Sequence, residues 1–129
     1  MSARAGRHIV FFLIGCTGYP LIEILWRGYT HISMMLAGGI CSVILSSICE
    51  RYLEASLLKK AFFSASAITA VEFMFGIVLN ILLKMNVWDY TSQPLNILGQ
   101  ICPMFFLLWG ILAFMLIPIV NILNKAMTF

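Results

Sequence analysis

The sequence predicts an all-α integral membrane protein, built as a bundle of four transmembrane helices. Of its 129 residues, 62% are hydrophobic and only 10% are charged, and the mean hydropathy is +1.01. Soluble domains carry about 25% charged residues. A chain this small could not bury so much apolar surface in a compact core, because small folds leave a large share of their surface in water. The composition therefore excludes a soluble globular enzyme and a disordered chain.

Four apolar segments predict one transmembrane domain over residues 1–129. They cover residues 9–26, 32–49, 61–83 and 97–123. A helix needs roughly 20 residues to cross a hydrocarbon core of about 30 Å. The first two segments just reach that length, and the other two are long enough to tilt. No segment alternates with period two as a membrane β-strand does, so all four are expected to be helices.

The distribution of basic residues predicts that both termini lie in the cytoplasm. Six of the eight Lys and Arg residues fall on one side of the membrane under this topology, namely Arg4, Arg7, Arg51, Lys59, Lys60 and Lys125. Arg27 and Lys84 fall on the other side. Cytoplasmic loops carry the excess of Lys and Arg, so the loops at 27–30 and 86–94 should face outward. No basic run exceeds two residues, and we expect no nucleic-acid partner.

Two features shape the first pair of segments. Pro20 lies inside the first segment and predicts a kink or a short unwound stretch there, because proline removes a backbone donor. In the second segment Gly38, Ser42 and Ser46 repeat every four residues. Such a stripe of small residues lets another helix approach closely, either within the same subunit or at a subunit interface.

The third segment carries an acidic residue deep in the predicted membrane. Glu72 shares one helix face with small or polar residues at spacings of three and four: Ser66, Thr69, Gly76 and Asn80. A charged carboxylate at this depth costs several kcal/mol, so Glu72 should face the bundle or a wet cavity. Two interpretations stay open. Glu72 could serve as a proton, cation or substrate site, or it could hydrogen-bond a neighbouring helix and fix the packing.

Amides at the predicted start of the fourth segment could extend a path from Glu72. Asn96 and Gln100 are one helical turn apart, so both side chains could point the same way, and Pro103 could expose a backbone carbonyl. Several transporters build their sites from polar groups beside a broken helix. We expect Asn80, Asn96 and Gln100 to line a path with Glu72.

A cluster of charged and aromatic residues is predicted at the outer rim. Glu23 and Arg27 have the i,i+4 spacing of a helical ion pair. Trp88, Asp89 and Tyr90 follow the third segment, and Trp and Tyr are typical of the membrane interface. We expect Asp89 to be held by Arg27 or by nearby backbone amides, and both aromatic rings to pack on the mouth of the bundle.

The sequence contains no catalytic or cofactor motif. There is no phosphate loop, nucleophile elbow or HExxH motif, and the cysteines have no metal-ligand spacing. We therefore expect no enzymatic activity, no cofactor and no metal. If the protein works with ATP, the ATPase must be another polypeptide.

Five short motifs in the second half resemble a known family. They are Glu72-Phe73-Met74-Phe75-Gly76, Val87-Trp88-Asp89-Tyr90-Thr91, Pro94-Leu95-Asn96, Gly99-Gln100-Ile101-Cys102 and Leu108-Trp109-Gly110. In this order and spacing they resemble the ABC-transporter permease family labelled CmpB-like or type IV, which is common in Firmicutes. The resemblance implies a multi-pass protein of the bacterial cell membrane.

Together these observations lead to an expected function with one alternative. The chain is expected to be a small permease-like or channel-like subunit in the lipid bilayer, acting as a homo-oligomer or with a partner membrane protein. Glu72 would be its central polar group. The alternative is a membrane scaffold or regulatory subunit that transports nothing, in which Glu72 is a packing residue.

Overall fold

The computed structural model describes residues 3–127 and confirms an all-α fold with four helices suited to a membrane. These are α1 (Ala3–Arg27), α2 (Ser33–Arg51), α3 (Leu57–Gly76) and α4 (Pro103–Ala126). A π-helical segment, η1 (Ile77–Leu82), continues α3 directly. Taking α3 and η1 together, each of the four helices is long and apolar enough to cross a membrane.

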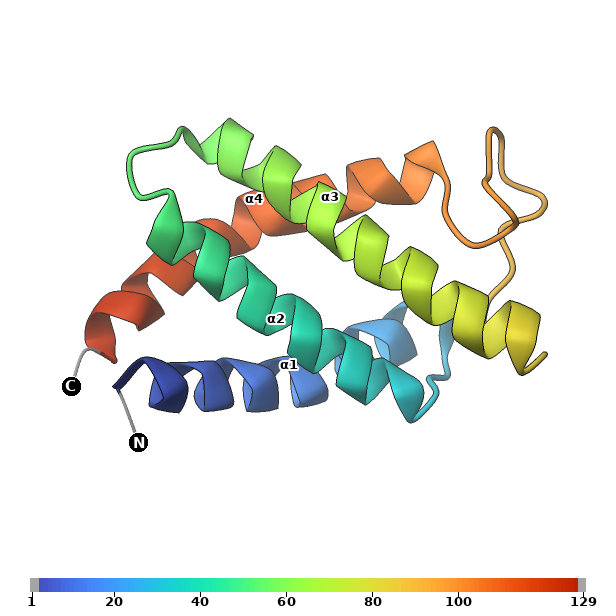
Figure 1. Cartoon of the computed structure of the whole chain (residues 1–129), viewed down its shortest axis with the longest axis horizontal. Helices are drawn as coiled ribbons and strands as arrows, with labels where there is room; N and C mark the ends of the chain where they lie inside the picture. Colours follow the sequence, from blue (N-terminus) through green and yellow to red (C-terminus); the bar gives the residue numbers. More distant parts are fainter. Residues whose placement is uncertain (1–2, 128–129) are drawn as a thin grey trace.

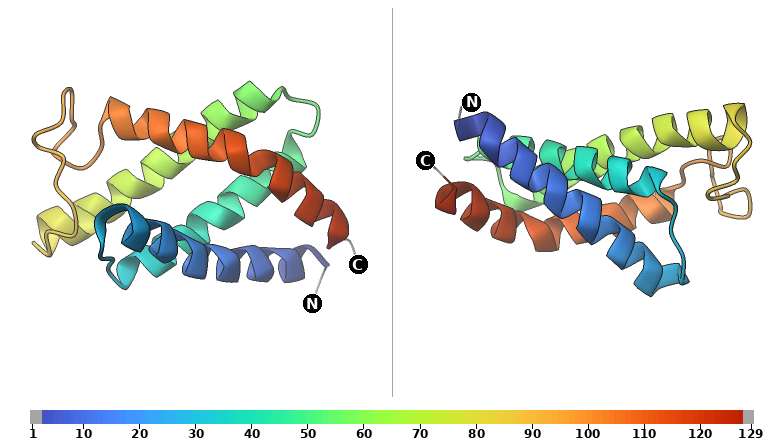
Figure 2. Two further views of the ribbon diagram at one scale, coloured as in Figure 1. Left: turned by 180° about the vertical axis from the view of Figure 1, so that it is seen from behind. Right: turned by 90° about the horizontal axis from the view of Figure 1, so that it is seen from below.

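The helices form two antiparallel pairs, α1 with α2 and α3 with α4 (Figure 1). The beginning of α1 and the end of α4 lie at the same end of the bundle, as an even number of spans requires. The long connection between η1 and α4, residues 83–102, lies at the opposite end in every view (Figure 2). We call this connection the outer loop. The outer loop therefore lies at one end of the helix bundle.

Two of the helices, α1 and α3, begin several residues before the apolar segments that predict them. α1 begins at Ala3 and α3 at Leu57, both earlier than the predicted residues 9 and 61. Hydropathy marks only the apolar part of a helix, and α3 takes its start from Ser56, whose side chain accepts the Lys59 backbone N–H at 3.2 Å.

The fourth helix begins at Pro103, not at residue 97. Proline fits the first position of a helix, and it holds the preceding residue extended; Cys102 has φ −155° and ψ 159°. Before it, Leu98 and Gly99 have φ of 54° and 70°, which no helix can include. Residues 97–102 therefore belong to the outer loop.

Pro20 does not interrupt α1. The helix runs through it from Ala3 to Arg27, so the unwound stretch expected at Gly18-Tyr19-Pro20 is not present. The side chain of Pro20 is buried.

The small residues of α2 pack against α1 and α4 of the same chain. A Cβ atom on Gly38 would lie 2.5 Å from the Gly15 carbonyl oxygen of α1, and one on Gly15 would overlap the Gly38 carbonyl. Ser46 is fully buried and donates its hydroxyl to Oδ1 of Asn124 in α4 at 3.1 Å. The glycines thus bring α1 and α2 into backbone contact, as small residues do between membrane helices.

A compact apolar core fills the end of the bundle opposite the outer loop. Its buried members are Phe11, Leu45, Cys49, Ala61, Ala113, Ile117 and Val120. At the same end Arg7 donates to the Glu50 carboxylate, linking α1 to the end of α2. Large apolar side chains cover the outside of the helices; Leu25 is 87% exposed and Leu58 is 74% exposed. In a membrane these surfaces contact lipid and cost nothing, whereas in water they would not be tolerated.

The close crossing of α1 and α2 predicts different effects for two glycines of the same helix. Gly15→Ala forces a methyl group into the Gly38 backbone and should destabilise the fold by about 1–3 kcal/mol. Gly18→Ala is the matched control, because no atom lies within 4 Å of its added Cβ. Unfolding in detergent micelles, followed by circular dichroism, gives both values. Equal stability of the two variants would contradict the crossing described here.

Candidate functional site

A partly open cavity of about 500 Å³ lies between the four helices and the outer loop. We call it the central cavity. Its wall includes Tyr19 of α1, Cys41 of α2, Glu72 of α3, Trp109 of α4 and Tyr90 of the outer loop. Every helix and the outer loop therefore contribute to the wall of this cavity.

Glu72 is held in the cavity wall by two neutral hydrogen-bond donors. The Tyr90 hydroxyl donates to Oε2 at 2.9 Å, and the Trp109 indole N–H donates to Oε1 at 3.3 Å. The ion pairs found within residues 3–127 do not include Glu72. A carboxylate offers about four lone-pair sites, so these two bonds leave acceptor capacity toward the cavity.

Stacking and backbone contacts fix the position of Tyr90. Its ring stacks on Phe105 of α4, with centroids 4.5 Å apart and planes inclined by 7°. Its backbone N–H donates to the Gly99 carbonyl at 2.8 Å. Burial raises the pKa of Tyr90, so its hydroxyl keeps its proton and stays a donor. The outer loop thus carries a rigid donor down to Glu72.

Asn80 of η1 and Gln100 of the outer loop tie the loop to η1 and α3. The Asn80 amide donates to Gln100 Oε1 at 2.7 Å, and its Oδ1 accepts the Val87 backbone N–H at 2.7 Å. The Trp88 indole N–H donates to the Gln100 carbonyl at 3.0 Å. Gln100 lies directly over Gly76, where a Cβ would come within 2.6 Å of its Oε1. Gly76 is therefore required for the loop to approach the helix.

The second part of the outer loop is held by Asn96. Its amide donates to the carbonyls of Thr91 and Gln93 at 3.2 and 2.9 Å, and its Oδ1 accepts the Gly99 N–H at 2.9 Å. Asp89 Oδ1 accepts the Thr91 N–H at 2.9 Å, and this hydrogen bond lowers the pKa of Asp89. These side chains replace regular secondary structure in satisfying the loop backbone.

The rim residues of α1 pair with each other and with the outer loop. Arg27 contacts Glu23 at 3.2 Å, and the Thr30 hydroxyl donates to the other Glu23 oxygen at 2.6 Å. Arg27 also donates to the Val87 carbonyl at 3.2 Å. Of the two partners expected for Asp89, the structure shows the backbone amide and places Arg27 on Val87 instead.

The residues predicted to form a path take two different positions. Glu72 lines the central cavity, whereas Asn80, Asn96 and Gln100 hold the outer loop together and are not among the lining residues. Asn96 and Gln100 do not share a helix face, because α4 begins after them. The sequence analysis missed the role of Trp109. An indole N–H on an apolar helix needs a buried acceptor, and this requirement could have indicated that Trp109 bonds an acidic or carbonyl oxygen.

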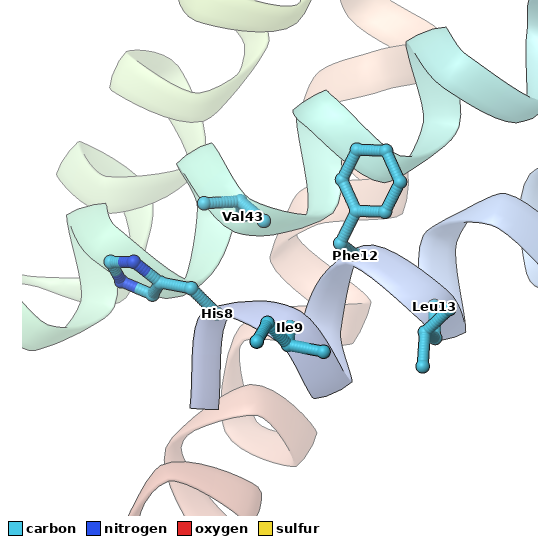
Figure 3. A pocket seen from close by; sticks show the side chains of 5 residues that line it. All are labelled: His8, Ile9, Phe12, Leu13 and Val43. Atoms are coloured by element: carbon cyan, nitrogen blue, oxygen red, sulfur yellow. The ribbon is translucent and has the colours of Figure 1, made fainter. Parts of the chain in front are cut away.

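A second, smaller pocket offers no comparable chemistry. It measures about 270 Å³ and lies between α1 and α2, with His8, Ile9, Phe12, Leu13 and Val43 around it (Figure 3). His8 is the only polar side chain in its lining. Nor do residues 3–127 contain a group of three or more His, Cys, Asp or Glu side chains that could hold a metal ion. The central cavity is the candidate site.

Four helices long and apolar enough to span a membrane, packed around a cavity with an acidic wall, define a multi-pass membrane protein. The chain belongs to the family described as "Putative ABC-transporter type IV", whose model matches residues 9–129. This confirms the resemblance carried by the sequence motifs. Neither a curated protein nor a solved structure matches the chain.

The five motifs of the resemblance meet in one place in the structure. The first supplies Glu72 and Gly76, the second supplies Trp88 and Tyr90, and the last supplies Trp109. The two between them, at 94–96 and 99–102, contain Asn96 and Gln100, which shape the loop. The motifs therefore describe one connected structure: a carboxylate, its two donors, and the loop that positions one of them.

Asn80→Ala should loosen the outer loop and lower stability by about 1–3 kcal/mol, because it removes the Asn80 partners of the Val87 N–H and of Gln100 Oε1. Ser92→Ala, on an exposed residue of the same loop, is the control and should change stability little. Thermal unfolding in micelles measures both, and hydrogen exchange should rise at residues 87–100 in Asn80→Ala alone. Unchanged exchange in that variant would refute the role of Asn80.

Proposed function

We propose that the chain is a permease-like or channel-like subunit of the bacterial cell membrane, in which Glu72 is the central polar group. The role is one of moving a solute or ion, with no covalent reaction catalysed by this chain. The observation that carries the proposal is the position of Glu72. It lines a cavity of about 500 Å³ built from all four helices.

The hydrogen bonding of Glu72 supports an exchangeable site. Both donors are neutral, so the charge of an ionised Glu72 has no counter-charge among the ion pairs of residues 3–127. A charge in a low-dielectric surrounding is costly unless it is paired or neutralised. Glu72 therefore has a free-energy reason to take up a proton or a cation from the cavity.

The size of the bundle supports action as an oligomer or with a partner. The cavity between the four helices has a volume of about 500 Å³, and broad apolar surfaces remain on the outside of the helices. A second copy or a partner membrane protein could complete a path across the membrane. The described family is one of ABC transporters, and a separate ATPase would be the energy source for such an assembly.

The orientation with both termini in the cytoplasm belongs to the same proposal. It rests on the six basic residues at the end where α1 begins and α4 ends, against two at the other end. In that orientation the outer loop faces away from the cytoplasm, and Tyr90 lies between the external solution and Glu72.

A membrane scaffold is the second candidate function, and one observation favours it. Each Glu72 oxygen accepts a hydrogen bond from a ring fixed by other contacts, Tyr90 on Phe105 and Trp109 against Tyr19. Such an arrangement also suits a carboxyl group whose task is to lock the outer loop onto the helices.

Proton flux into proteoliposomes separates the two candidates. Vesicles containing the full chain and an internal pH-sensitive dye are given an inward proton gradient, with the potential clamped by potassium and valinomycin. Glu72→Gln should slow the protein-dependent flux at least about tenfold, the effect of losing about 1.4 kcal/mol of stabilisation for the moving charge.

Glu54→Gln is the matched control for the flux measurement. Glu54 is an exposed carboxylate between α2 and α3, and its replacement should leave the flux unchanged. Protein-dependent flux that is equal in the native protein and Glu72→Gln would contradict the permease function. Loss of stability in Glu72→Gln without a change in flux would support the scaffold.

A further inference from the structure

The wall of the central cavity combines one carboxylate with several aromatic rings. Tyr19, Phe75, Tyr90, Phe105 and Trp109 all line it together with Glu72. The rings are fixed against one another: Tyr90 stacks on Phe105, and Tyr19 meets Trp109 edge to face at 5.7 Å and 76°. Aromatic faces attract cations within about 6 Å, and more strongly where water is excluded.

The charges around the cavity favour a positively charged ligand. Arg27 is the only basic residue in the lining, and it already pairs with Glu23. Glu72 is the remaining lining charge, and its two donors are uncharged. When Glu72 is ionised, the cavity therefore carries one uncompensated negative charge. An anionic ligand would meet repulsion from Glu72.

The surroundings of Glu72 fit an organic cation better than a metal ion. Calcium takes six to eight oxygen ligands, and magnesium requires a near-octahedral set. The part of the chain described by the structure holds no group of three or more side chains suited to a metal. An organic cation needs no such coordination shell, because one carboxylate can balance its charge while rings contact its apolar groups.

We propose that the central cavity binds a lipophilic monovalent organic cation of the quaternary ammonium or phosphonium type. Its charge lies against the free side of the Glu72 carboxylate, and its apolar groups pack on Tyr19, Tyr90 and Trp109. A cavity of about 500 Å³ falls in the range that takes drug-sized ligands, about 300–1,000 Å³. This proposal names the class of solute for the proposed function, and it therefore rests on that function.

Equilibrium binding to the purified full chain in detergent tests this cation site. The probe is radiolabelled tetraphenylphosphonium, and tetraphenylborate is the anion of the same shape. We expect saturable binding of the phosphonium and none of the borate. Glu72→Gln should weaken phosphonium binding about tenfold or more, the effect of one lost charged contact. Glu54→Gln should bind as the native protein does.

Tyr19→Leu provides a second variant, which keeps Tyr90 and Trp109 as the donors to Glu72 but removes the ring contact on Trp109. It removes a ring from the cavity wall and should weaken phosphonium binding about threefold or more. If gel filtration shows that Glu72→Gln fails to fold, Tyr19→Leu and the borate comparison test the cation site in its place. No saturable binding, borate binding equal to phosphonium binding, or equal affinity in folded Glu72→Gln and native protein would each overturn the proposal.

The binding and flux measurements can fail separately. Phosphonium binding that depends on Glu72, without any proton flux that depends on Glu72, supports the cation site and contradicts proton movement through Glu72. Flux that depends on Glu72, without phosphonium binding, contradicts the cation site and leaves the permease function supported.

Discussion

The Glu72 carboxylate inside an apolar helix bundle is the constraint on which the rest of the structure depends. A carboxyl group in this setting must find hydrogen-bond donors, because hydrocarbon offers none and leaving it unpaired costs several kcal/mol. The chain supplies Trp109 from α4 and Tyr90 from the outer loop. One donor therefore comes from a spanning helix, and the other comes from a segment outside the spans.

The use of a loop residue as a donor explains why the outer loop is so extensively bonded. A tyrosine on a loose loop would pay the entropy of ordering each time it reached Glu72. Here Asn80, Asn96 and Gln100 hold the loop backbone, and Gly76 leaves room for the loop to lie on the helix. The entropy of ordering Tyr90 is therefore lost once, when the protein folds. The hydrogen bonding of Glu72 and the integrity of the outer loop are consequently coupled through Tyr90.

Much of the fold could be predicted from the sequence, but less of the site could. Length and hydropathy are enough to place four helices, because lipid permits few other structures. They do not place helix ends: α4 begins at Pro103, and the positive φ of Gly99 that precedes it depends on tertiary contacts. Glu72 could be identified from the sequence, because a carboxylate in the middle of an apolar segment has a high free-energy cost. Its partners could not, because the contacts of Tyr90 and Trp109 span 18 and 37 residues of sequence.

A double-mutant cycle on stability tests the link between the loop and the carboxylate most directly. Glu72→Gln, Tyr90→Phe and the double variant are unfolded in micelles under the same conditions. If the hydroxyl and the carboxylate are bonded as described, the two single effects should not add, and the coupling energy should be about 1–3 kcal/mol. Effects that add to within about 0.3 kcal/mol, the level seen for independent sites, would contradict the account.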